Sequence, residues 1–122
     1  MNRYTVTEYE RHTYWTGSGG RIVRENERDT FTGTAAEVAR YLADEIRDNY
    51  QSEADYFHEA ARDTGQPDPF QMAREIETDM ERHAADGPAE LIQGADEGTP
   101  EEIGMDPEPR IYATVRKVEP GE

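Results

Sequence analysis

The chain has 122 residues, of which 34% are hydrophobic and 34% are charged, and its formal net charge is −15. A chain of this length can bury one modest core, so we expect a single domain over residues 1–122. The absence of cysteine excludes disulfides and thiolate-bound metals, and the absence of a long apolar run predicts a cytoplasmic protein without a signal peptide or membrane span.

Residues 3–15 predict a first β-strand and residues 21–31 a second, because Thr, Tyr, Val and Trp favour strands. The glycine-rich residues 16–20 join them. A phosphate-binding loop would lie between a strand and a helix, and a Lys-Ser or Lys-Thr pair would follow it. Neither condition holds here, so we interpret the glycines as a hairpin turn.

The register across this turn places Arg11 opposite Glu25 and Glu8 opposite Arg28. Opposite charges on neighbouring strands favour that pairing by a few tenths to about 1 kcal/mol per pair. The middle of the hairpin is polar on both faces, so we expect its base to pack on helices and its tip to project into solvent. Trp15, beside the turn, either anchors a partner surface or stacks on a neighbour within the hairpin.

A helix is predicted to begin after Thr34, because Thr34 and Glu37 have the spacing of a capping box. The apolar positions of one helix face follow at helical spacing: Val38, Leu42 and Ile46. The same stripe continues to about residue 63, but the weak helix formers of residues 49–52 favour a break near Tyr50. Gly65 ends whatever helix precedes it.

The next helix is predicted to have Asp68 at its N-cap and Pro69 at its first position, and to end at residues 87–88. Residues 88–109 contain seven acids and no base, which predicts a mobile acidic loop. Residues 110–118 alternate apolar and polar side chains and predict a final strand. The expected fold is therefore α+β. The N-terminal hairpin and the C-terminal strand form a small antiparallel sheet, and two or three helices cover one of its faces. The order of elements is β-β-α-(α)-α-loop-β.

No catalytic, cofactor or metal site is predicted. Asp55 and His58, and likewise Asp79 and His83, have spacings that can place two metal ligands on one helix face. His58 points away from the inward stripe of its helix and His83 lies at the edge of its own, however, so surface positions explain both better. The chain has no nucleophile elbow and no cofactor fingerprint, which predicts a protein that is not an enzyme.

The negative charge is unevenly distributed, since residues 1–34 hold five basic and five acidic groups and the whole excess lies within residues 35–109. Adaptation of a proteome to high salt would acidify every exposed element, so the balanced hairpin favours a dedicated acidic surface. Simple solubility is the other interpretation. A polyanion repels nucleic acid and anionic membranes, and attracts basic surfaces over a Debye length of about 10 Å.

The sequence therefore predicts a non-enzymatic protein that binds a basic protein surface through its helices and acidic loop. A phage or mobile-element inhibitor that mimics nucleic acid is one version. The alternatives are a small enzyme or ligand-binding domain with a sheet–helix cleft, and an assembly subunit, including a homodimer, that pairs through the hairpin edge. The candidate partner-binding residues are Asp44, Asp48, Glu90, Asp96, Glu97, Glu101, Glu102, Asp106, Glu108 and Trp15.

Overall fold

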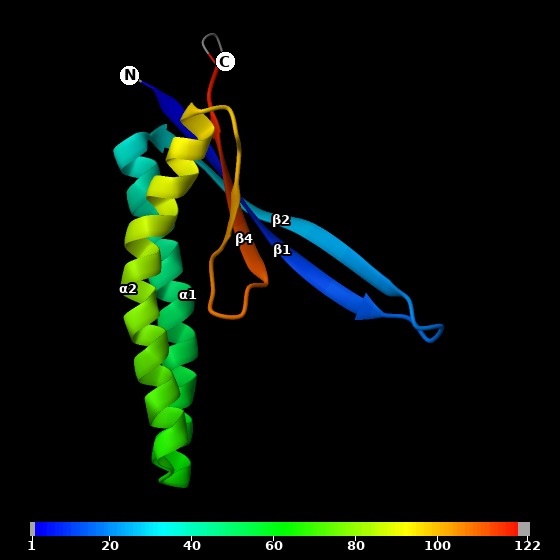
Figure 1. The fold of residues 1–122 in the computed structure, drawn as a ribbon, viewed down its shortest axis with the longest axis vertical. Coiled ribbons are helices and arrows are strands. Elements are labelled where there is room, and N and C mark those ends of the chain that lie inside the picture. Colours follow the sequence, from blue (N-terminus) through cyan, green and yellow to red (C-terminus); the bar gives the residue numbers. More distant parts are fainter. Residues whose placement is uncertain (1, 120–122) are drawn as a thin grey trace.

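A computed structural model describes residues 2–119 and shows a long pair of helices packed at one end against a four-stranded antiparallel sheet (Figure 1). The sheet order is β2-β1-β4-β3. The predicted α+β class is confirmed, including the pairing of the C-terminal strand with the N-terminal hairpin. The elements are β1 (Arg3–Trp15), β2 (Arg21–Thr34), α1 (Ala35–Thr64), α2 (Pro67–Asp96), β3 (Glu102–Gly104) and β4 (Ile111–Lys117).

The β1–β2 hairpin keeps the predicted pairing at Arg11 and Glu25, whose Nε and Oε1 atoms lie 2.8 Å apart. The register shifts between Glu8 and Tyr9, so Glu8 lies opposite Asp29 and not Arg28 as predicted. The extra residue on β2 is a β-bulge, which local sequence signals do not reveal. The bulge places two carboxylates opposite each other at the base of the hairpin.

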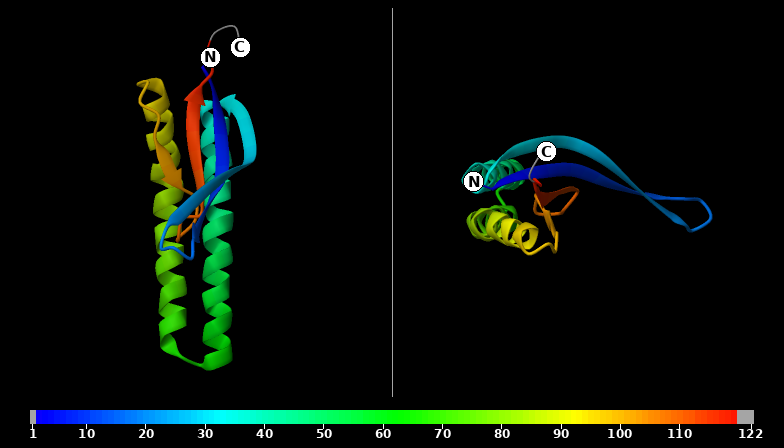
Figure 2. Two further views of the ribbon diagram at one scale, coloured as in Figure 1. Left: turned by 90° about the vertical axis from the view of Figure 1, so that its right-hand side faces the viewer. Right: turned by 90° about the horizontal axis from the view of Figure 1, so that it is seen from above.

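Strand β4 pairs with β1 only along Tyr4–Glu10. Beyond that point the hairpin continues as a two-stranded ribbon, residues 11–25, which we call the arm. The arm projects away from the helices, and the sheet curves over one side of the helix pair (Figures 1 and 2). This confirms that the base of the hairpin packs on the helices and that its tip lies in solvent.

Helix α1 begins at the predicted capping box: the Glu37 N–H donates to Thr34 Oγ1 at 3.3 Å, and the Thr34 N–H donates to Glu37 Oε1 at 3.0 Å. Gly65 ends the helix in the left-handed conformation, with φ of 67°. The predicted break near Tyr50 is wrong, because α1 is continuous over 30 residues. Tyr50 packs against a small core at the α1–α2 interface, made of Ala54, Ala73 and Ile76, and this tertiary contact outweighs the weak local propensity.

Helix α2 begins at Pro67 with Gln66 at the N-cap, two residues before the predicted start with Asp68 as cap. It does not end at Gly87–Pro88, as predicted, but continues to Asp96. A proline within a helix removes one backbone hydrogen bond. Here Gly87 and Pro88 are both buried, and Ile103 packs against Gly87, where an added Cβ would lie 3.0 Å from the Ile103 Cδ1. The burial of this turn compensates for the missing hydrogen bond.

The predicted loop over residues 88–109 is therefore wrong for residues 88–96, which are helical, and for residues 102–104, which form β3. Helix α2 continues because Leu91 and Ala95 lie in the main core. That core fills the space between the sheet and the adjoining ends of the helices, and includes Tyr4, Val6, Val38, Leu42, Ile46, Ala84, Met105, Ala113 and Val115. The helices extend well past the sheet (Figure 1), and their projecting half rests on the small core alone.

Candidate functional site

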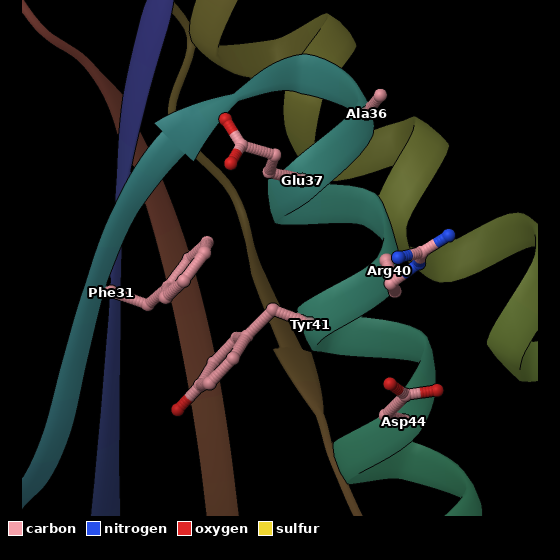
Figure 3. A pocket seen from close by; sticks show the side chains of 6 residues that line it. All are labelled: Phe31, Ala36, Glu37, Arg40, Tyr41 and Asp44. Carbon is pink, nitrogen blue, oxygen red and sulfur yellow. The ribbon is translucent and has the colours of Figure 1, made fainter.

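An open groove of about 460 Å³ lies between β2 and the first turns of α1 (Figure 3). We call it the aromatic groove, because Phe31 and Tyr41 form its wall, with parallel rings whose centroids are 4.6 Å apart. Arg40 makes no ion pair with the described residues. The complete lining is Phe31, Ala36, Glu37, Arg40, Tyr41 and Asp44. The groove thus combines an apolar wall with two carboxylates and one arginine.

A buried carboxyl group lies next to this groove. Glu8 on β1 is 3% exposed, and the Tyr41 hydroxyl oxygen is 3.3 Å from Glu8 Oε2 and 3.3 Å from Asp29 Oδ2. The Tyr41 hydroxyl has one proton, so it satisfies one carboxylate at a time. Glu8 Oε1 has no hydrogen-bond partner. A buried, half-satisfied carboxylate is costly, so the proton has reason to remain on Glu8.

Burial, the largest cause, and the negative charge of Glu45 together raise the pKa of Glu8 to about 7, although the hydrogen bond from Tyr41 lowers it. Burial also raises the pKa of Glu45, with a contribution from the neighbouring Asp48. The pKa of Tyr41 is raised by burial and then by the nearby Glu8 carboxylate. Glu8 can therefore exchange a proton near neutral pH. Glu8 does not line the groove. Its protonation therefore affects the contact between β1 and α1, where its carboxyl group meets Tyr41.

The two helices carry most of the exposed acidic groups, with 16 carboxylates and five arginines between them. Within the described chain, helix arginines pair with three of these carboxylates. Arg47 lies 3.8 Å from Asp44 and 3.5 Å from Glu81, and Arg82 lies 2.9 Å from Asp79. Most of the remaining carboxylates face solvent, so the helix pair presents a strongly negative surface.

Three of the predicted partner-binding residues also form hydrogen bonds within the fold. Asp96 accepts a hydrogen bond from the Tyr4 hydroxyl at 2.6 Å, and Glu102 accepts from the Arg11 guanidinium at 3.1 Å. Asp106 Oδ1 accepts the N–H of residues 110 and 111 at 3.0 Å and 3.4 Å. These contacts hold the C-terminal segment against β1 and shape the turn that precedes β4.

The other predicted residues are exposed and come from several elements. Asp44 and Asp48 lie on α1, Glu90 lies on α2, and the loops that flank β3 hold Glu97, Glu101 and Glu108. Trp15 is 76% exposed at the tip of the arm, away from the helices (Figure 1). The structure therefore does not bring Trp15 together with the carboxylates of its own chain.

The histidines pair with groups other than those of their predicted spacing. His58 Nε2 lies 3.0 Å from Glu77 Oε1 on α2, and His83 Nε2 lies 2.6 Å from the carbonyl oxygen of Gly104. His12 Nε2 lies 3.0 Å from Glu10 Oε2 on its own strand. Residues 2–119 contain no cluster of three or more His, Asp or Glu side chains that could hold a metal, and none of their helices is both long and apolar enough to cross a bilayer.

Sequence reasoning missed the burial of Glu8 and the aromatic groove. The alternation of Tyr4, Val6 and Glu8 was a usable signal, because side chains two apart on a strand share one face. The groove had no such signal, since Phe31 and Tyr41 meet only after α1 folds back on β2. A scan against protein-family models, a search of curated proteins and a search of solved structures each gave no match to the chain.

Proposed function

We propose that the protein is a non-enzymatic interaction protein that binds a basic protein surface through the carboxylates of α1 and α2. The observation that supports this is the excess of 16 carboxylates over five arginines on the two helices, with arginine partners for only three of the carboxylates in the described chain. Such a surface attracts a positively charged partner and accelerates its association.

The shape of the helix pair favours the same function. Its projecting half extends past the sheet (Figure 1), so a partner can approach it without contacting the arm. Tyr56, Phe70 and Met72 are exposed on this half, at 66%, 49% and 45%. Apolar side chains among carboxylates supply contact area that salt does not screen. A partner whose basic residues normally contact nucleic acid is one fit, with the carboxylates replacing phosphates.

The test compares two variants that remove equal charge from different places. The helix variant neutralises exposed carboxylates of the projecting half: Glu59→Gln, Asp63→Asn, Asp68→Asn and Glu75→Gln. The loop variant neutralises four exposed carboxylates outside the helices: Glu97→Gln, Glu101→Gln, Glu108→Gln and Glu119→Gln. Each full-length chain is immobilised, and binding of a lysine-rich probe peptide and of host proteins is measured at rising salt.

We expect the wild-type chain to retain the probe and one or a few host proteins, and to lose them steeply between low and moderate salt. The helix variant should lose most of this binding and the loop variant should keep it. Equal binding by the wild type and the helix variant, or binding independent of salt, would contradict the proposal. The alternatives of a small enzyme or ligand-binding domain stay predictions, for which a ligand screen against the aromatic groove is the measurement.

A further inference from the structure

The arm tip, residues 14–23, exposes apolar side chains on both of its faces. Tyr14 pairs with Ile22 on one face, while Trp15 and Val23 share the other. Their exposed fractions are 52% for Tyr14, 45% for Ile22, 76% for Trp15 and 43% for Val23. Contiguous exposed apolar surface on a projecting element marks a contact site, because leaving it in water is unfavourable.

The arm tip also differs in charge from the rest of the molecule. Residues 12–24 contain Arg21 and Arg24 and no carboxylate. Neither arginine forms an ion pair within the described chain. Each face of the ribbon therefore combines an aromatic residue, an aliphatic residue and an unpaired arginine. A tip of this composition fits a groove that has an apolar wall and carboxylates at its rim.

The same chain has such a groove. The aromatic groove presents the stacked rings of Phe31 and Tyr41, with Asp44 and Glu37 at its edge (Figure 3). Its volume of about 460 Å³ is within the range of roughly 300–1,000 Å³ that holds small organic groups. The arm of the same molecule projects away from this groove (Figure 1), so its own tip does not fill it.

We propose that the arm tip of one copy docks in the aromatic groove of a second copy, and that the second copy returns the contact. The Trp15 face packs on Phe31 and Tyr41, and Arg21 lies near Asp44. A reciprocal contact of this kind forms a closed dimer with two-fold symmetry. The dimer contact uses the part of α1 next to the sheet, whereas the proposed surface for a basic partner lies on the projecting half of the helices. Experiments can therefore refute one proposal without refuting the other.

The contact area is that of a weak dimer. At the observed exposure, Trp15 leaves roughly 190 Å² of aromatic surface on the contacting face of each tip, since a whole aromatic side chain buries about 150–250 Å². Two tips and the surfaces that cover them then bury roughly 800 Å² through Trp15, to which Val23 and Arg21 on the same face add, and interfaces below roughly 1,200 Å² belong to weak complexes. The groove lining holds two carboxylates, Glu37 and Asp44, and one arginine, Arg40. Its charge is therefore opposite in sign to that of the basic tip, and this difference favours the approach of the tip.

The test measures the dimer dissociation constant of the full chain by analytical ultracentrifugation. Trp15→Ala removes the anchor, and Ala36→Arg fills the groove at an exposed helix position. Each should raise the dissociation constant at least about 30-fold, the loss typical of a buried aromatic anchor. Tyr56→Ala is the matched control, because Tyr56 is a similarly exposed aromatic outside the contact. It should leave the dissociation constant unchanged, and circular dichroism should show all three variants folded.

Mixing the two defective variants gives the decisive result. The Trp15→Ala chain keeps its groove and the Ala36→Arg chain keeps its arm tip, so a mixture restores one of the two contacts and should associate more tightly than either variant alone, although less tightly than the wild type. A mixture that associates no more tightly than either variant alone would overturn the proposal. So would a wild-type chain that stays monomeric at about 1 mM, which would assign the tip to a different protein. Loss of dimers with Trp15→Ala but not with Ala36→Arg would overturn it too, because the tip would then contact another surface.

Discussion

Replacement of Glu8 by glutamine tests whether the buried carboxyl destabilises the fold at neutral pH. Glu8 is 3% exposed and its Oε1 atom has no partner, so its charged form is poorly solvated. Glutamine has nearly the same shape and no charge. Its carbonyl oxygen can accept the Tyr41 hydroxyl proton, so the substitution removes the charge and keeps this contact.

The magnitude follows from the pKa. Folding raises the pKa of Glu8 from 4.5 to about 7, mainly because the group is buried. The folded chain therefore holds a proton that the unfolded chain has released between these two values, and the free energy of unfolding falls as the pH rises through this range. Above pH 7 the whole penalty is present. It amounts to about 3 kcal/mol, because each tenfold change in the proton-binding constant corresponds to about 1.4 kcal/mol.

We expect Glu8→Gln to match the wild type near pH 4 and to be more stable by up to about 3 kcal/mol at pH 8. Urea denaturation at a series of pH values measures this difference. Glu27→Gln, which removes a charge from an exposed position on β2 and leaves Glu8 in place, should keep the wild-type pH dependence. If Glu8→Gln kept that dependence as well, or were the less stable protein at pH 8, the assignment of the raised pKa to Glu8 would be wrong.

Three further substitutions test the packing and capping of the helices by urea denaturation. Thr34→Ala removes the side-chain cap of α1 and should cost about 1 kcal/mol, and no loss would show that the cap is unimportant. Gly94→Ala would place a Cβ 2.8 Å from the carbonyl oxygen of Thr99 and should cost about 1–3 kcal/mol, whereas Gly17→Ala meets open space and should be near neutral. Leu42→Ala empties a fully buried position of the main core and should cost about 2–5 kcal/mol, so a loss below about 1 kcal/mol would contradict its place there.

The sequence predicted those features that local chemistry determines. The capping box at Thr34 depends on two side chains three residues apart, and the Arg11–Glu25 pairing depends on a short glycine turn. Both are confirmed. The α+β class followed from the change of apolar period between residues 3–31 and the helix after Thr34.

The errors have a common cause, which is tertiary contact overriding local propensity. Residues near Tyr50 are weak helix formers, yet α1 continues because that segment packs on α2. Pro88 is a strong local stop signal, yet α2 continues because Leu91 reaches the core. The bulge beside Glu8 and the groove at Phe31 depend on elements that meet from distant positions, so no window of the sequence shows them.

The candidate carboxylates were predicted from the number of acidic residues in a region of the chain, and not from their arrangement in space. Counting charges locates the acidic region between Thr34 and Pro109, but it cannot show which carboxylates also bond within the fold. Asp96, for example, receives the Tyr4 hydroxyl from a strand 92 residues away in sequence. The hydrogen-bond partner of a carboxylate can come from a distant part of the sequence. The carboxylates that bond within the fold are therefore identified only from the folded structure.

The position of β4 has a consequence for synthesis on the ribosome. Strand β4 is made after β1, β2 and β3 but lies between β1 and β3, and its Val115 pairs with Val6 of β1. Until residues 111–117 have emerged, the nascent chain exposes the edge of β1 that β4 covers, a row of unpaired backbone groups that other chains can join. A ribosome that stalls before residue 111 would therefore leave an aggregation-prone intermediate, and the seven residues of β4 are what cover this edge.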